Sequence, residues 1–264
     1  MTLPHIDISL TSISSRLSTL PETLSSLLAQ DYPNFTVNLY LSRDPYMLDE
    51  GVPELPQKLA GLIDGSAGRL RCKYCKNIGP YRKLIPYLYE NWGLSRLVVT
   101  VDDDTIYPET WLRQMVDSYN SFGCVIAYRG HEMQFRNGAL APYRTWMRSG
   151  IQENPSSLLL PTGKDGVLYD TAYFSIDVFN MEEAKRLAPT TDDLWFRWHL
   201  ALNGIRTYII NTDYTRETFT ESDYDSSLYL NFNISGGNDA AVERLYGYFK
   251  EHHGFDITSL AREM

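Results

Sequence analysis

The strand-like segment before three consecutive aspartates constrains the fold more than any other part of the chain. Residues 96–101 read Arg-Leu-Val-Val-Thr-Val, a short run rich in β-branched side chains, and the run ends at Asp102, Asp103 and Asp104. Such a run is typical of a parallel strand that is buried on both faces. Because ligands bind outside the carboxyl ends of strands in open α/β sheets, the three acids are predicted to lie at a ligand site.

Strand and helix patterns alternate over roughly the first half of the chain. Strands are predicted at 5–13, 35–41, 70–75, 96–101 and 124–128, with helices at 17–28, 80–92 and 108–119 between them. This alternation predicts right-handed crossovers and an α/β fold, a three-layer α/β/α sandwich around a mainly parallel sheet. Residues 129–179 are rich in aromatic side chains, Gly and Pro, and we expect irregular hairpins and loops that cover one edge of the sheet. Helices at 181–187, 192–203 and 238–250 and a strand at 206–210 complete the prediction.

Composition limits the partners and the compartment. A chain of 264 residues without an internal repeat or a linker predicts a single domain over residues 1–264. Its net charge of −9 argues against binding the phosphate backbone of nucleic acid. The sequence holds neither a stretch long enough for a transmembrane segment nor the start of a signal peptide, and its three cysteines do not form a disulfide framework, so we expect a cytoplasmic protein.

The three aspartates predict a divalent cation. Three ionised carboxylates at the end of a buried strand repel one another unless a cation or hydrogen-bond donors offset the charge. Oxygen ligands without His or Cys suit Mg²⁺ or Mn²⁺, which complete their coordination with water and phosphate oxygens. The alternative is a solvated acidic loop that caps the helix beginning near Pro108.

A second acidic pair, Asp192-Asp193, stands at the start of an aromatic-rich predicted helix. One acid can cap the helix, and Asp192 suits that role. Asp193 is then free of a capping role and could act in catalysis. A carboxylate partly desolvated beside Trp195 or Trp198 has the raised basicity that a general base requires.

Three separated segments resemble the GT-A glycosyltransferases, in particular family-two-like bacterial enzymes that build cell-surface polysaccharide. Leu-Thr-Ser-Ile-Ser-Ser-Arg at 10–16 resembles the first strand and nucleotide loop of that family. Val-Asp-Asp-Asp-Thr-Ile-Tyr-Pro at 101–108 resembles its D-x-D motif, and Thr-Asp-Asp-Leu-Trp-Phe at 191–196 resembles its late acidic motif. The resemblance covers most of the chain and implies a nucleotide-sugar-binding half at 1–130 and an acceptor-binding half at 131–264.

The resemblance also implies roles for individual residues. Polar side chains that would contact the donor are Thr11, Ser12, Arg16, Ser42, Lys83, Asp102 and Asp103. Asp44 could replace Ser42, and Arg82 could replace Lys83. Asp104 would ligate Mn²⁺ or Mg²⁺ directly and Asp102 would contact the ribose and a metal-bound water, although three adjacent acids leave the register of the motif open.

The implied activity is metal-dependent transfer of a sugar from a UDP-sugar donor to a hydroxyl of a glycan or lipid-linked acceptor. Asp193, with Asp192 beside it, would take the proton of the attacking hydroxyl and give inversion, whereas a site without a base in reach would favour retention. A lipid-linked acceptor would place the protein at the inner face of a membrane. Two alternatives remain open: a sugar nucleotidyltransferase, disfavoured because residues 10–16 contain no glycine, and a non-catalytic module that binds Ca²⁺.

Overall fold

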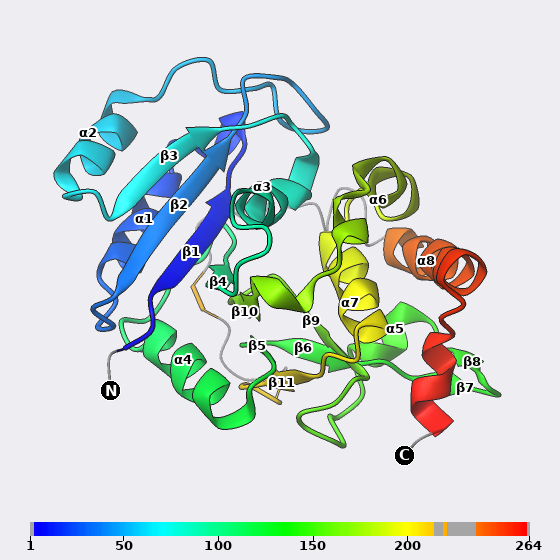
Figure 1. The fold of residues 1–264 in the computed structure, drawn as a ribbon. Helices are drawn as coiled ribbons and strands as arrows, with labels where there is room; N and C mark the ends of the chain where they lie inside the picture. Colours follow the sequence, from blue (N-terminus) through cyan, green and yellow to red (C-terminus); the bar gives the residue numbers. More distant parts are fainter. Residues whose placement is uncertain (1–2, 214–218, 221–235, 263–264) are drawn as a thin grey trace.

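A seven-stranded sheet forms the centre of the protein in the computed structural model, which describes residues 3–213, 219–220 and 236–262. Its strand order is β11-β5-β10-β4-β1-β2-β3 (Figure 1). The strands are β1 (Ile6–Thr11), β2 (Phe35–Leu41), β3 (Leu70–Tyr74), β4 (Leu97–Thr100), β5 (Val125–Ala127), β10 (Val167–Asp170) and β11 (Thr207–Ile209). β1 pairs in parallel with β2 and β4, β2 with β3, and β5 with β11. The mainly parallel sheet is therefore confirmed.

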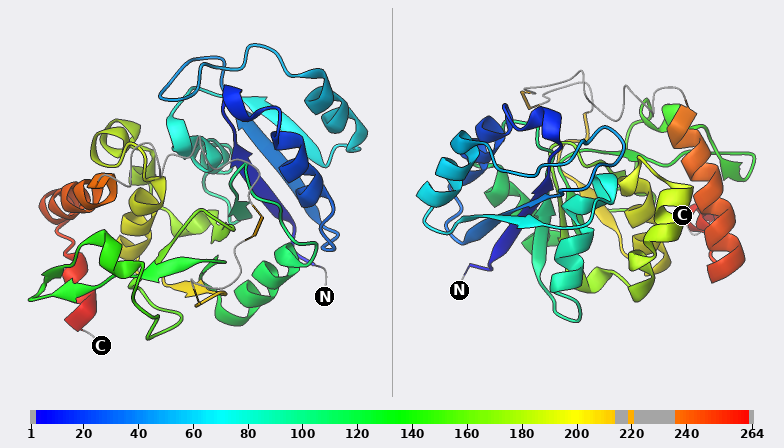
Figure 2. Two further views of the ribbon diagram at one scale, coloured as in Figure 1. Left: turned by 180° about the vertical axis from the view of Figure 1, so that it is seen from behind. Right: turned by 90° about the horizontal axis from the view of Figure 1, so that it is seen from above.

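Helices cover both faces of this sheet (Figures 1 and 2). One hydrophobic core joins it to α1 (Leu20–Leu28), α2 (Gln57–Gly65) and α4 (Trp111–Phe122). The other joins it to α3 (Ile85–Glu90), α6 (Met181–Leu187), α7 (Asp192–Leu202) and α8 (Asn238–His253). Successive strand residues point to opposite faces, so Val98 packs in the second core and Val99 in the first. The three-layer architecture follows from this division.

The segment between β5 and α6 departs in part from the prediction. Its first portion forms two small antiparallel pairs, β6 (Gly130–Glu132) with β9 (Leu159–Pro161) and β7 (Phe135–Arg136) with β8 (Ala139–Leu140), and α5 (Tyr143–Trp146) lies between β8 and β9. The prediction of loops at one edge is wrong for β10, which lies inside the sheet, antiparallel to both β4 and β5. Its four residues are all buried, and a run this short carries no periodicity that separates it from a loop.

The helix predicted over 80–92 is two elements. A 3₁₀ turn, η2 (Gly79–Lys83), is followed by α3, which begins at Ile85 and has a proline in its first turn. Pro86 has no N–H to donate to the preceding turn, so an unbroken α-helix cannot run through this point. Short 3₁₀ turns also form at η1 (Ser14–Arg16), η3 (Thr171–Tyr173), η4 (Ile176–Phe179) and η6 (Ile257–Arg262). Across the described ranges, the helices are too short or too polar to span a bilayer.

Candidate functional site

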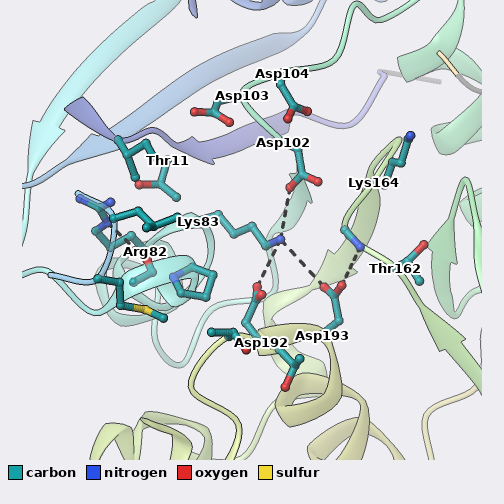
Figure 3. Close-up of a pocket in the computed structure, with 18 of the residues that line it drawn as sticks. Thr11, Arg82, Lys83, Asp102, Asp103, Asp104, Thr162, Lys164, Asp192 and Asp193 are labelled. Atoms are coloured by element: carbon teal, nitrogen blue, oxygen red, sulfur yellow. Dashed lines mark hydrogen bonds and ion pairs between the residues drawn. The ribbon is translucent and has the colours of Figure 1, made fainter. Parts of the chain in front are cut away.

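A pocket of about 550 Å³ opens at the edge of the sheet where β1 and β4 end and β10 begins. β10 runs opposite to β4, with Val167 beside Thr100, so the loop preceding β10 lies next to the aspartates that follow β4. The N-terminus of α7 closes the same pocket. All three aspartates of 102–104 and both of 192–193 line it (Figure 3).

Asp103 is the most buried of the three aspartates and is held by two side chains of the loop after β1. Its carboxylate accepts a hydrogen bond from Ser12 Oγ and pairs with Arg16, whose Nη1 lies 2.6 Å from Oδ1. Thr23 Oγ1 donates to its backbone oxygen at 2.8 Å. Burial raises the pKa of Asp103 above its ordinary value, although Arg16 and Ser12 oppose the shift. Asp103 therefore anchors the aspartate turn to the loop after β1.

Asp102 and Asp104 are the more exposed pair and the one suited to an external cation, although each also faces a cation of the protein: Lys83 Nζ lies 3.3 Å from Asp102 Oδ1 and Arg16 Nη1 lies 3.2 Å from Asp104 Oδ2. The Asp102 side chain is 34% exposed and that of Asp104 is 16% exposed, whereas Asp103 is at 7%. Burial, together with the charges of Asp102 and Asp103, raises the pKa of Asp104 to about 7 against the effect of Arg16. In the described part of the chain, no group of three or more His, Cys, Asp or Glu side chains is arranged to hold a metal ion. A Mg²⁺ or Mn²⁺ ion here would need water and phosphate oxygens besides these two carboxylates, as such ions commonly do.

Lys83 connects the two acidic motifs. Its Nζ lies 3.3 Å from Asp102 Oδ1, 3.2 Å from Asp192 Oδ2 and 3.9 Å from Asp193 Oδ1 (Figure 3). Burial alone lowers the pKa of Lys83, but the three carboxylates outweigh it and hold that pKa well above its ordinary value. Lys83 is therefore a permanent internal cation between β4 and α7.

Asp193 is held from two sides. Its Oδ2 accepts a 2.9 Å hydrogen bond from the backbone N–H of Gly163, in the loop before β10, and its Oδ1 faces Lys83. Burial raises the pKa of Asp193 to about 7, Lys83 opposes the shift, and Asp192 adds to it. Its side chain is nevertheless 27% exposed, against 6% for Asp192. Asp193 is thus oriented, basic and open to the pocket, whereas Asp192 is buried against Lys83.

Gly163 has no room for a side chain. A Cβ built on it would lie 2.5 Å from Lys83 Nζ, 3.3 Å from Asp193 Oδ1 and 3.5 Å from Asp102 Oδ1. Its backbone φ is not in the left-handed region, so glycine matters here because it lets these groups approach closely, and a larger residue would displace the Lys83 ammonium.

A second buried ion pair lies at the other side of the pocket. Arg82 Nη2 is 2.9 Å from Asp49 Oδ2, and these side chains are 1% and 2% exposed. Asp49 also accepts backbone N–H groups of Ser14 and Gly51, both at 3.0 Å. Arg82 Nη1 is buried and finds no hydrogen-bond partner among the described residues. Asp49 escaped the sequence analysis because it sits in an irregular turn with no motif around it.

The structure brings most of the predicted residues to the pocket. Its lining includes Thr11, Ser12, Arg16, Lys83, Asp102, Asp103, Asp104, Asp192 and Asp193. The Thr11 hydroxyl donates to the Tyr40 backbone oxygen at 2.8 Å. Ser42 does not line the pocket: its side chain is fully buried and its Oγ accepts the backbone N–H of Asp44. Ser42 therefore shapes the turn after β2, and the structure does not bring it to the pocket.

The raised pKa of Asp104 predicts a pH dependence of stability. A carboxyl that titrates near pH 7 when folded, against 3.8 ordinarily, keeps a proton that the unfolded chain has released. The free energy of unfolding therefore falls as pH rises from about 4 to 7, by up to about 4 kcal/mol from this group. Urea unfolding of wild type and Asp104→Asn without metal checks this: wild type should lose stability relative to the variant over that range. A pH-independent difference would contradict the assigned environment.

The arrangement supports two chemical operations in one pocket. Two partly exposed carboxylates can share a divalent cation with an anionic ligand, and a third, Asp193, can accept a proton near neutral pH. Lys83 fixes the distance between these groups because it contacts Asp102 and Asp193 at once.

The comparisons with known proteins identify the fold. No family model matches the sequence, and no curated protein matches it. Among solved structures, residues 1–349 of S. aureus TarS in complex with UDP match with a TM-score of 0.55 and 16% identity, covering 93% of this chain and 72% of that one. The complex of the same fragment with UDP-GlcNAc gives 0.52 and 17%, over 93% and 73%. A further S. aureus TarS structure gives 0.54 and 17%, over 93% of this chain and 43% of its own. The shared fold is of the GT-A type, as the sequence predicted.

Proposed function

We propose that this protein is a glycosyltransferase that uses a nucleotide sugar, with UDP-sugar as donor and Mn²⁺ or Mg²⁺ as cofactor. The observation that carries the proposal is that the carboxylate pair Asp102 and Asp104 and the base candidate Asp193 line one pocket, in which Lys83 contacts both Asp102 and Asp193. The similar TarS structures hold UDP and UDP-GlcNAc, which supports a nucleotide-sugar donor.

The nucleotide would bind at the side of the pocket formed by the loop after β1 and by η2. Arg82 offers a buried Nη1 donor, and Asp49 fixes the rest of its guanidinium. The carbonyl oxygen of a nucleobase could accept a hydrogen bond from this unpaired Nη1. We therefore assign this contact to Arg82 rather than to Lys83, which three carboxylates already engage. Thr11 and Ser12 line the same side.

Asp104 and Asp102 would hold the divalent cation. The raised pKa of Asp104 reflects burial near like charges, and a bound cation would relieve that cost. When bound, the ion would supply charge stabilisation for the departing diphosphate. Asp103 is the less suitable ligand because both of its carboxylate oxygens are engaged, one by Ser12 and the other by Arg16, and its side chain is only 7% exposed; Arg16 reaches Asp104 at the longer distance of 3.2 Å.

Asp193 would act as the general base. The N–H of Gly163 and the ammonium of Lys83 orient its carboxylate, and its raised pKa suits proton abstraction near neutral pH. The acceptor hydroxyl would lose its proton to Asp193 while its oxygen attacks the anomeric carbon, and a base on the face opposite the leaving group gives inversion. Asp192 would contribute indirectly by holding Lys83. The acceptor itself, proposed as a glycan or lipid-linked saccharide, and the division into halves at about residue 130 stay predictions.

Calorimetric titration with UDP, with and without Mn²⁺, tests the proposal. Because the carboxylate pair must share the cation with the nucleotide diphosphate, Mn²⁺ should tighten UDP binding in wild type and have little effect in Asp104→Ala. Asp64→Ala, an exposed acid in α2, is the matched control and should behave as wild type. Ca²⁺ binding that UDP does not affect would instead favour a non-catalytic module, and release of pyrophosphate from UTP with a sugar phosphate would favour a nucleotidyltransferase.

A further inference from the structure

One wall of the pocket has no part in the donor site described above. It is built from β6, α5 and the N-terminus of α8, which contribute His131, Tyr143, Met147 and Asn238 to the lining. The wall is continuous: the rings of His131 and Tyr143 lie 5.9 Å apart, and the backbone N–H of Tyr143 donates to Asp239 Oδ1 at 2.7 Å. α8 is thereby fixed against α5 with Asn238 at the pocket.

Besides Arg82 Nη1 and Asp192 Oδ2, two uncharged oxygens at this pocket are buried without a hydrogen-bond partner among the described residues. The side-chain oxygens Asn238 Oδ1 and Thr191 Oγ1 find no hydrogen bond among the described residues, and both residues are only 8% exposed. Leaving such atoms unpaired is costly, and in a ligand pocket the missing partner is most simply a ligand group. Thr191 directly precedes Asp192 and Asp193, so its hydroxyl lies near the proposed base.

The pocket-lining side chains of this wall, His131, Tyr143, Met147 and Asn238, carry no positive charge, and the one carboxylate that joins them, Asp239, is held by the backbone N–H of Tyr143. Burial and the nearby Arg129 keep His131 neutral by lowering its pKa to about 4. The remaining groups are a thioether, an amide, a hydroxyl and an aromatic ring. Such a surface favours a ring that combines hydroxyl donors with an apolar face, and it offers no cation of its own to an anionic group.

We propose that Asn238, Thr191 and Tyr143 form an acceptor subsite for an uncharged saccharide ring, which donates hydroxyl hydrogen bonds to the two orphan oxygens and packs on the aromatic ring. This inference rests on the proposed function, because it assigns to the same pocket the molecule whose hydroxyl Asp193 deprotonates. It adds that the ring nearest the base carries no phosphate.

Saturation-transfer NMR with methyl β-glucoside, methyl β-galactoside and methyl N-acetyl-β-glucosaminide tests the subsite, in the presence of saturating UDP and Mg²⁺. At least one glycoside should bind wild type and bind Asn238→Ala about five- to tenfold more weakly, the usual effect of one lost hydrogen bond. Thr191→Val, which keeps the side-chain shape, should show a similar loss. Asn34→Ala, an exposed residue just before β2 at the edge of the sheet away from the pocket, is the control and should match wild type.

The outcomes separate the subsite from the donor site. Absence of glycoside binding, equal binding to wild type and both variants, or tighter binding of glucose 6-phosphate than of the glycosides would overturn the subsite while calorimetry still registers UDP. Conversely, loss of UDP binding with glycoside binding that depends on Asn238 would overturn the donor assignment and leave the saccharide subsite standing.

Discussion

Asp193→Asn is expected to slow the release of UDP from UDP-sugars by about 10²- to 10⁴-fold, the usual contribution of a general base. An amide keeps the shape of the side chain and can still accept the Gly163 N–H, but it cannot take a proton. Mn²⁺-dependent UDP binding should persist, because Asp193 stands apart from the Asp102 and Asp104 pair. Rates measured on a panel of UDP-sugars, alongside calorimetry on the same preparation, give both readouts.

The pH profile sharpens this test. Activity that depends on ionised Asp193 should rise with pH through about 7, the pKa that burial gives this carboxyl, and the rise should vanish in the residual activity of Asp193→Asn. Asp64→Asn, in the exposed part of α2, serves as the isosteric control. Undiminished turnover in Asp193→Asn would refute the assignment of Asp193 as the general base and would favour a retaining mechanism.

Gly163→Ala is expected to cost about 10²-fold in the same assay while leaving the protein folded. The new Cβ would lie 2.5 Å from Lys83 Nζ, so the ammonium must move. It stands at the end of a flexible side chain, and the loss of stability should therefore stay below about 3 kcal/mol. Its displacement, however, loosens Asp193 and Asp102 together, and small misplacements of reacting groups are costly in rate.

Gly61→Ala is the matched control for that substitution. A Cβ on Gly61, within α2, meets no atom within 4 Å, and alanine there should stabilise the protein by about 0.5 to 1 kcal/mol with unchanged turnover. Urea unfolding separates the two effects of Gly163→Ala. Normal turnover in Gly163→Ala would show that the contact between Lys83 and the acids does not position the base.

The sheet and the aspartates at its edge could be predicted because each is indicated by a pattern of neighbouring residues in the sequence. A β-branched run before 102–104 indicates a buried strand and its ligand end at once. The register of the motif could not be predicted, because the three aspartates are chemically identical and differ only in which side chains of other segments contact them. The structure separates them through the loop after β1, far away in sequence, where Ser12 and Arg16 together engage both oxygens of Asp103 while Arg16 lies 3.2 Å from Asp104.

The missed features depend on contacts between distant segments. Asp49 matters because it pairs with Arg82, and Gly163 matters because it leaves room for Lys83. Neither partner can be inferred from the residues that are neighbours in sequence. The family resemblance implies that Lys83 contacts the nucleotide, and that contact stays a prediction. The three carboxylate contacts that the structure gives Lys83 could not be inferred from the sequence, because they come from distant segments. β10 was missed because its pairing with β4 joins residues 67 or more positions apart.

The antiparallel strand has a consequence for protein engineering. β10, from the later portion of the chain, is hydrogen-bonded between β4 and β5 from the earlier portion. Chimeras that exchange donor and acceptor specificities by crossing over near residue 130 would therefore pair a foreign β10 with native neighbours along both of its edges. Crossovers placed after Asp170 would transfer β4, β5 and β10 as one block and keep both ladders of β10 intact, leaving the β5–β11 pair to form across the junction, so recombination libraries should be cut there.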